Sequence, residues 1–280
     1  MSRIAILTDS SANLTPGLVQ KNHIHVLPLK ILWKEEVLRD GIDITPDEFY
    51  TRLGKESASP TTSQATVAEF SQAFEKLAAD YDAIFAPLIS SGVSGTVDSA
   101  VTAAKEFTKC PLEVYDTHQA AGGLALVVLA AAQVAYAGAS LEMVSRTAHK
   151  VSESMHTYFK VDTLKYLHRG GRIGGAARFL GTALDIKPIL FLNQGRIDAS
   201  ERVRTSKKAL KRLIDIIIEK SGGKPSHICV MHASDREEAE IARQTLTRQL
   251  NCVEFEILDL SPAIGAHVGP GTLGIAIYPD

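Results

Sequence analysis

Hydrophobic and polar residues alternate in blocks along the chain, and the blocks predict a regular succession of strands and helices. Short apolar runs are typical of buried strands, and apolar residues three or four apart are typical of helices with one buried face. In the first half, these patterns predict strands at 3–9, 83–89 and 112–117, extended segments around a turn within 23–41, and helices at 45–54, 67–80, 95–107, 120–139 and 140–154. This succession favours a mainly parallel sheet with helices on both faces.

The pattern changes after about residue 155. Strands are predicted at 156–161, 188–204, 227–233, 253–260 and 271–278, with helices at 206–220 and 237–250. The residues Asn193–Gly195 predict a tight turn between antiparallel strands. We therefore expect an α/β protein with two units, a parallel-sheet unit at 1–155 and a mixed-sheet unit at 156–280. The cleft between two such units is the default place for a ligand.

The segment 120–139 is apolar on all sides, with Gln133 as its only strongly polar residue. About 20 apolar residues suffice to cross a membrane. However, the segment is mostly alanine and glycine and lacks a basic flank at its start. Helices that are apolar all round also occur in protein cores, so we expect a buried helix and no stable membrane insertion.

Composition narrows the class of protein. The chain has 280 residues, of which 45% are hydrophobic and 22% charged, and its formal net charge is −2. Neither nucleic acid nor an anionic membrane surface is indicated as a partner, because no sign of charge is in excess. Three widely spaced cysteines fit neither a disulfide framework nor a zinc site. This cysteine usage predicts a reducing, cytoplasmic location. The N-terminus has too short an apolar run for a signal peptide.

Two short segments are rich in hydroxyl groups and contain no lysine. They are "PTTSQ" at 60–64 and "SSGVSGT" at 90–96. The second lies where a strand passes through a glycine-containing loop into a helix, and the free N–H groups of a helix N-terminus suit an anion. The alternative is that Ser94 and Thr96, like the hydroxyls of 61–63, serve only as helix caps.

Enzymatic interpretations of these loops are weaker. No P-loop motif occurs, but "GVSGT" at 92–96 follows a strand and resembles the G-x-S-x-G pattern, with Ser94 as its serine and Thr96 in place of the last glycine. A serine acyl hydrolase is therefore an alternative, although no partner acid or base can be assigned from sequence. A phosphotransferase acting on a small acid would need carboxylates for magnesium, and the hydroxyl-rich loops contain none.

Two further residues lie in glycine-rich surroundings. Arg172, within 166–184, lies between two pairs of glycines at 170–171 and 174–175, which predicts a bent, tightly packed segment that holds the arginine near the backbone. The guanidinium either caps carbonyl groups or lies near an anion, and both interpretations stay open. His267 precedes Gly269 and has no companion ligands at metal-binding spacing. Asp9, at the end of the first strand, is placed either to accept loop N–H groups or to fix a histidine or an arginine.

Six motifs together resemble one family. "ILTDSSANL", "PTTSQ", "ISSGVSGT", "YLHRGGRIGG", "IKPIL" and "HVGPGTLGI" occur in the order found in the DegV family of bacterial fatty-acid-binding proteins. The resemblance covers residues 3–280. Each motif is weak by itself, but six in the same order make a chance match improbable.

The resemblance implies a function and a site. It implies that two α/β domains enclose one long-chain fatty acid, such as palmitate, in a tunnel between them, with no catalytic residue and no other cofactor or metal. It also implies a role in lipid transport or fatty-acid metabolism, in which the carboxylate is presented to a fatty-acid kinase. Thr62 and Ser94 would bind the carboxylate. The supporting network would be formed by Thr61, Gly95, Thr96, Arg172 and His267.

A basic segment at 198–212 is a candidate docking surface for such a kinase. Arg202 and Arg204 alternate at strand spacing, so their side chains are expected on one side of the strand. The alternative is an ordinary solvated strand edge. The apolar helix 120–139 is expected to contribute to the wall of the tunnel.

Overall fold

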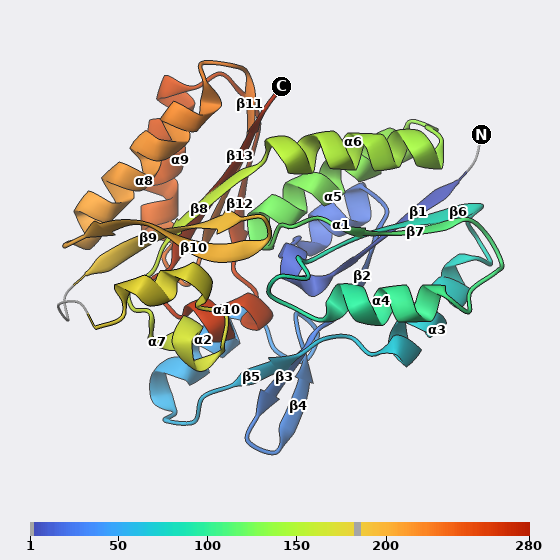
Figure 1. Cartoon of the computed structure of the whole chain (residues 1–280), viewed down its shortest axis with the longest axis horizontal. Helices are drawn as coiled ribbons and strands as arrows, with labels where there is room; N and C mark the ends of the chain where they lie inside the picture. The colour runs from blue at the N-terminus through green and yellow to red at the C-terminus, as the bar shows by residue number, and fades with distance from the viewer. Residues whose placement is uncertain (1–2, 182–185) are drawn as a thin grey trace.

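A parallel sheet organises the first half of the chain. The computed structural model describes residues 3–181 and 186–280 (Figure 1). The strands of this sheet, in spatial order, are β2 (Ile24–Leu27), β1 (Ile4–Asp9), β6 (Ala83–Leu88) and β7 (Leu112–Asp116). Every neighbouring pair is parallel. The expected parallel sheet is therefore confirmed.

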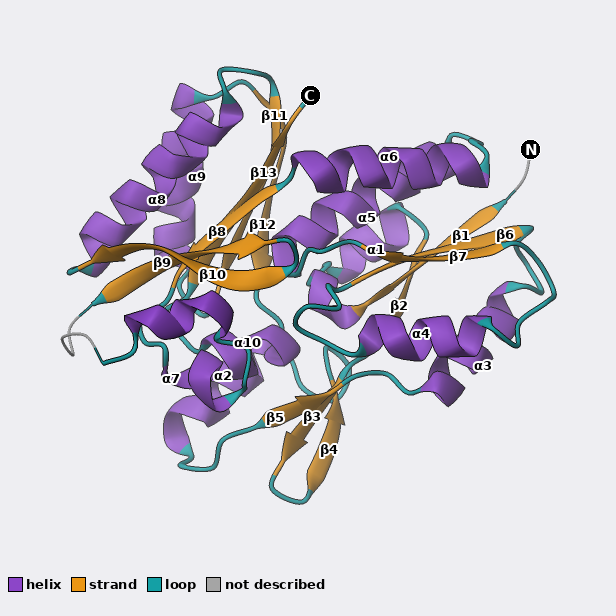
Figure 2. Cartoon of the chain, viewed as in Figure 1, coloured by secondary structure: helices purple, strands orange, loops and turns teal. Residues whose placement is uncertain are grey.

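Helices cover both faces of this sheet. Successive residues of β1 alternate between two hydrophobic clusters, because side chains of a strand point to opposite faces. On one face lie α3 (Val67–Leu77) and α4 (Thr96–Ala104), and on the other lie α5 (Ala121–Tyr136) and α6 (Leu141–Ser154), as Figure 2 shows. All four correspond to predicted helices.

A mixed sheet organises the second half, as predicted. Its spatial order is β10 (Arg196–Val203), β9 (Lys187–Asn193), β8 (His156–Lys160), β13 (Leu273–Pro279), β11 (Ser226–His232) and β12 (Cys252–Asp259). Only β11 and β12 pair in parallel. The last strand of the chain thus lies in the middle of the sheet, between β8 and β11.

The predicted tight turn joins β9 to β10. Gln194 and Gly195 both have positive φ angles, 47° and 76°. Positive φ at both central residues is typical of the type I′ turn that joins two antiparallel strands. Helices α8 (Ser206–Ser221) and α9 (Arg236–Gln249) cover the outer face of the sheet, where their apolar side chains form one cluster with β11 and β13.

Helix α5 lies between the two sheets. It contacts β1 and β6 on one side and β11 and β13 on the other. Eleven of its sixteen residues are buried, from Ala121 to Ala132, which confirms the prediction of a buried helix. In the part of the chain that the structure describes, no helix is long and apolar enough to cross a membrane. The largest hydrophobic cluster includes α5 and residues of both sheets. The boundary at residue 155 stays a prediction.

A small third sheet lies beside the other two. Its antiparallel strands are β4 (Glu36–Arg39), β3 (Lys30–Trp33) and β5 (Thr61–Ser63). Helix α2 (Pro46–Lys55) follows β4 and has the predicted start, since Thr45 and Glu48 form a reciprocal capping box.

Several short elements were not predicted. They are the helices α1 (Pro16–Lys21), α7 (Lys165–Arg169) and α10 (Pro262–Val268), the 3₁₀ turns at Ser10–Ala12 and Gly174–Phe179, and the strand β5. Each has seven residues or fewer, which is shorter than the window over which a repeated hydrophobic period identifies a helix. The predicted bent segment around Arg172 is confirmed as α7 followed by the second 3₁₀ turn, although its residues 182–184 lie outside the described residues.

Candidate ligand site

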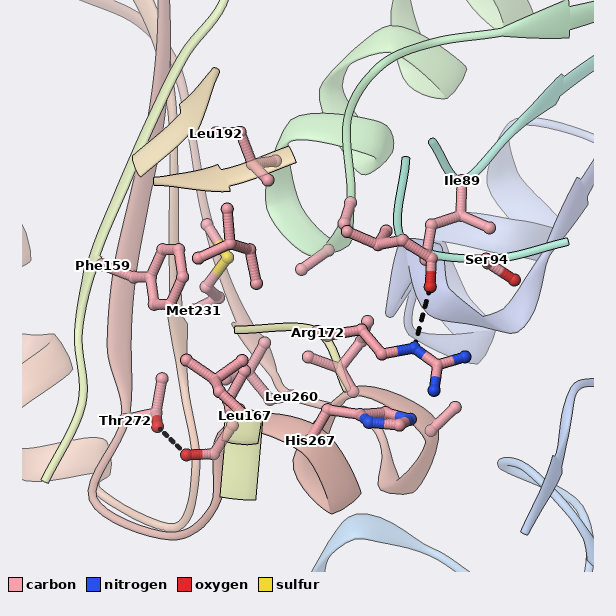
Figure 3. A pocket seen from close by; sticks show the side chains of 18 of the residues that line it. Ile89, Ser94, Phe159, Leu167, Arg172, Leu192, Met231, Leu260, His267 and Thr272 are labelled. Atoms are coloured by element: carbon pink, nitrogen blue, oxygen red, sulfur yellow. Dashed lines mark hydrogen bonds between the residues drawn. The ribbon is translucent and has the colours of Figure 1, made fainter. Parts of the chain in front are cut away.

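A mainly apolar cavity lies between the sheets. The volume in which the centre of a water molecule can lie inside this cavity is about 100 Å³. In Figure 3, Ser94, Arg172 and His267 lie toward one side, and Phe159, Leu192 and Met231 lie toward the other. The lining residues come from both halves of the chain, and four of them lie on α10. They are Leu29, Thr62, Ile89, Val93, Ser94, Ala120, Ala121, Thr157, Phe159, Leu167, Arg172, Leu192, Ile197, Met231, Leu260, Ala263, Ile264, His267, Val268, Thr272 and Gly274.

Thr62 reaches this cavity from the middle of β5. Its neighbours Thr61 and Ser63 point to the opposite face of the strand, since side chains alternate there, and Thr61 is exposed. The Thr62 hydroxyl lies 2.6 Å from Nε2 of His267. Helix α3 is capped by Thr66 instead, so the hydroxyls of 61–63 are not its caps.

Ser94 lines the cavity just before α4. Its hydroxyl lies 2.8 Å from the hydroxyl of Thr96 and accepts a hydrogen bond from the Thr96 N–H at 3.3 Å. Ser94 therefore faces the cavity and accepts the first N–H of α4, but the N-cap residue is Gly95, so neither Ser94 nor Thr96 is the cap expected as the alternative. Gln64 joins the two hydroxyl-rich segments, since its side-chain amide donates to the carbonyl of Gly95.

Arg172 is held by backbone groups, as expected from its glycine-rich surroundings. Its Nε donates to the carbonyl of Val93 at 3.1 Å, and its Nη1 donates to the carbonyl of Gly170 at 2.5 Å. The guanidinium thus caps carbonyls and also lines the cavity. It links the segment after α7 to the loop that carries Ser94 and supplies a positive charge beside the hydroxyl groups.

His267 projects from the last turn of α10. Burial, with the positive charges of Arg172 and Arg169, lowers its pKa to about 4, so the ring is neutral at neutral pH. Its Nδ1 is buried without a hydrogen-bond partner among the described residues. Gly170 packs directly against this nitrogen, where any Cβ would collide with the ring. The close contact fixes the ring beside Thr62.

Asp9 lies outside the cavity and organises a neighbouring loop. Its carboxylate accepts hydrogen bonds from the backbone N–H groups of Ser11 and Ile89, as expected from its place at the end of the strand. Burial raises its pKa, although these hydrogen bonds act in the opposite direction. Because Ile89 lines the cavity, Asp9 contributes to the shape of the site indirectly.

The surroundings of Ser94 do not support a hydrolase. Its hydrogen bonds within the described part of the chain go to Thr96, whereas the nearby imidazole of His267 is bonded to Thr62. A nucleophilic serine needs a base within hydrogen-bond reach. Across residues 3–181 and 186–280, no group of three or more histidine, cysteine or acidic residues is placed to hold a metal ion.

Arg202 and Arg204 lie away from the cavity, at the end of the edge strand β10. Both are exposed. Arg202 stacks over the ring of Phe179 at 4.7 Å and donates to the carbonyl of Arg178. Arg204 follows the last residue of the strand.

Sequence reasoning did not locate most of the apolar wall. Leu29, Phe159 and Met231 are separated widely along the chain, and only the packing of the sheets brings them together. The apolar helix expected to line a tunnel contributes Ala121 at its first position, next to Ala120. The alternation of side chains along a predicted strand would have placed Phe159 on the same face of β8 as Thr157, which also lines the cavity.

The fold is that of an α/β protein with a mainly apolar cavity between its sheets. A family model, described as an uncharacterised protein of the DegV family, matches residues 3–280. The chain belongs to the DegV family. Protein DegV of Bacillus subtilis (strain 168) is 34% identical over 274 residues, which cover 97% of this chain and 98% of that protein.

Two solved structures are similar over the whole chain. One is a DegV family protein from Thermus thermophilus, described by its fatty acid binding, with a TM-score of 0.94, 34% identity, and coverage of 99% of this chain and 100% of that one. The other is DegV of Bacillus subtilis, described as a fatty acid binding protein, with a TM-score of 0.91, 31% identity and full coverage of both chains.

Proposed function

We propose that this protein binds one long-chain fatty acid in the cavity between its sheets and acts as a carrier, without catalysis of its own. The observation that carries the proposal is an apolar cavity in which hydroxyl groups, a guanidinium and a neutral imidazole lie toward one side. The two similar structures described as fatty acid binding support it.

In this proposal, Thr62 and Ser94 donate hydrogen bonds to the carboxylate. A buried carboxylate is costly unless it is hydrogen-bonded. His267 supports Thr62, and Thr96 and Gly95 support Ser94. Arg172 supplies a positive charge nearby. Thr61 lies on the other face of β5, so its contribution is limited to the position of the strand.

The alkyl chain supplies most of the affinity. About 14 buried methylenes at ~0.8 kcal/mol each give roughly 11 kcal/mol before the costs of association. Hydrogen bonds to the head group contribute about 1–3 kcal/mol each. They fix the orientation of the acid and favour acids over alkanes.

Native mass spectrometry tests the binding. Protein purified from a bacterial host is expected to carry one fatty acid per chain, because a cavity of this kind extracts lipid from its surroundings. A native mass equal to that of the bare polypeptide, with no acid recovered in organic solvent, would contradict the proposal.

The same proposal includes presentation of the acid to a fatty-acid kinase in the cytoplasm. Arg204, with Arg202, is placed on an exposed strand end where it can meet an acidic surface. Charges at the rim of an interface change the association rate more than the affinity.

Arg204→Ala should therefore lower acyl-phosphate formation by a kinase while lipid binding is unchanged. Arg248→Ala, an exposed change on α9, is the control. Equal turnover of the parent and Arg204→Ala at low and physiological salt would contradict docking at this residue.

A further inference from the structure

Asp40, directly after β4, is a buried carboxylate outside the proposed head-group site. Its side chain is almost fully enclosed, at 2% exposure. One carboxylate oxygen, Oδ1, accepts the backbone N–H of Ala263 at 3.3 Å. The other, Oδ2, accepts the hydroxyl of Ser10 at 2.7 Å. Each of these bonds leads to a residue of the cavity wall.

The first bond holds the start of α10. Ala263 lines the cavity, and the same helix carries His267 to Thr62. The second bond continues to another part of the wall, because the Ser10 hydroxyl accepts the backbone N–H of Leu29 at 3.0 Å. Asp40 therefore joins two walls of the cavity from behind, one from the first half of the chain and one from the second.

Neighbouring side chains hold the same stretch of backbone. Tyr50 donates to the carbonyl of Leu260, and the side-chain oxygen of Asn13 accepts the N–H of Ser261. Three side chains from the first 50 residues thus hold residues 260–263. Burial raises the pKa of Tyr50, so its hydroxyl stays neutral, and Asn13 does not titrate. Asp40 is the member of this group that can change charge under ordinary conditions.

We propose that Asp40 is a positioning residue for the ligand site, whose ionised carboxylate holds α10 and Leu29 in the arrangement that retains a fatty acid. This inference rests on the proposed function. A carboxylate can accept both hydrogen bonds at once. After protonation, or in an asparagine, only the carbonyl oxygen remains a good acceptor. The Ser10 hydroxyl then either accepts a hydrogen bond from residue 40, which leaves its own proton without this acceptor, or turns away, and in both cases the connection between Ala263 and Leu29 is weakened.

The Asp40 carboxylate is protonated within a pH range that experiments can reach. Burial raises the pKa of Asp40 from 3.8 to about 6, and the nearby charge of Asp9 acts in the same direction, while the side chains of Ser10 and Ser261 and the N–H of Ala263 oppose it. The other titratable group facing Asp40 is Tyr50, on α2. His267, with a pKa of about 4, does not titrate in the same range. Ligand retention should therefore weaken as the pH falls through about 6.

The test measures release of a fluorescent long-chain fatty acid into excess neutral phosphatidylcholine vesicles between pH 5 and pH 8. At pH 8, Asp40→Asn should release the acid about three- to tenfold faster than the parent, with a melting temperature that is no lower. At pH 5 the two release rates should converge. Protonation of the fatty acid itself affects both proteins alike and cancels in the ratio. Asp43→Asn makes the same chemical change at an exposed position and should match the parent throughout.

Equal release by Asp40→Asn and the parent at pH 8, or a ratio that is the same at pH 5 and pH 8, would overturn the inference. Ser10→Ala removes the bond at Oδ2 and is the second variant if Asp40→Asn does not fold. Unchanged release from Ser10→Ala at pH 8 would also overturn it. A parent protein that fails to hold the fatty acid at pH 8 contradicts the proposed function instead, so the two failures are distinguishable.

Discussion

Thr62 and Ser94 use their hydroxyl groups in different ways. The Thr62 hydroxyl is bonded to a side chain from the distant helix α10, whereas Ser94 is bonded to its near neighbour Thr96. A ligand that bonds to Thr62 therefore also depends on the position of α10. One that bonds to Ser94 depends on the local geometry at the start of α4.

Removal of either hydroxyl should weaken binding of a long-chain fatty acid. Thr62→Ala and Ser94→Ala are each expected to cost about 1–3 kcal/mol of binding free energy while the fold stays intact. Titration with a labelled acid measures the loss. If both variants bind like the parent, the carboxylate lies elsewhere. Stoichiometric labelling of Ser94 by a fluorophosphonate would favour the hydrolase instead.

A change at Gly170 tests the position of His267. In Gly170→Ala, the added methyl group would collide with Nδ1 of His267, so the ring should move away from Thr62 and the affinity for the acid should fall at least severalfold. The backbone there has φ −73°, which alanine adopts without strain.

The matched control for this change is Gly54→Ala, within α2. A Cβ there meets nothing within 4 Å, and helical alanine is favoured over glycine by about 0.5–1 kcal/mol. The control should keep its affinity and gain stability. Calorimetric titration with the fatty acid measures the affinity of both variants. An unaltered affinity in Gly170→Ala would show that the contact with Gly170 does not hold the His267 ring.

Among the elements, α3 depends on a cap that the hydroxyl-rich segment does not provide. Thr66 accepts the N–H of Glu69, and the Glu69 carboxylate accepts the N–H of Thr66. The same carboxylate forms an ion pair with Lys30 of β3 at 2.8 Å. The cap therefore also ties the helix to the small sheet that carries Thr62.

Thr66→Ala should lower the free energy of unfolding by about 1 kcal/mol, the usual cost of a lost N-cap. Thr61→Ala, at an exposed position on the outward face of β5, should change it by less than about 0.5 kcal/mol. Urea denaturation of the two variants measures both. A larger loss in Thr61→Ala than in Thr66→Ala would contradict the capping shown by the structure.

The long elements were predictable from sequence, and the short ones were not. The start of α2 is predicted by its capping residues Thr45, Pro46 and Glu48. Helix α5 is recognisable from its length and apolar character. Helix α10 has seven residues, and Gly265 lies in its middle because Phe49 and Tyr50 of α2 leave no room for a side chain. Its existence depends on tertiary contacts, so sequence reasoning found His267 as a candidate without the helix that places it.

For the molecule as a whole, Asp40 makes stability depend on pH in a particular direction. Its folded-state pKa, about 6, lies above its ordinary value of 3.8. Between these two values the folded protein binds more protons than the unfolded chain. The contribution of Asp40 to the free energy of unfolding therefore falls as the pH rises through this range, by on the order of 3 kcal/mol.

The melting temperature of the parent, relative to Asp40→Asn, should thus decrease from pH 4 to pH 8. The comparison isolates Asp40 from the exposed carboxylates, such as Asp43, whose pKa is lowered by its ion pair with Arg39. Differential scanning calorimetry at several pH values measures the trend. A difference between the two proteins that does not change with pH would contradict an elevated pKa at Asp40.

The central place of β13 in the larger sheet has a consequence for synthesis. A chain that emerges from the ribosome carries β8, β9 and β10 on one side of a gap and β11 and β12 on the other, and only Leu273–Pro279 fill it. Helix α10, with its part of the cavity wall, emerges immediately before that strand. The nascent protein therefore completes the sheet and the cavity wall together, once β13 has emerged, and a chain that lacks this strand has no closed cavity in which to trap a lipid.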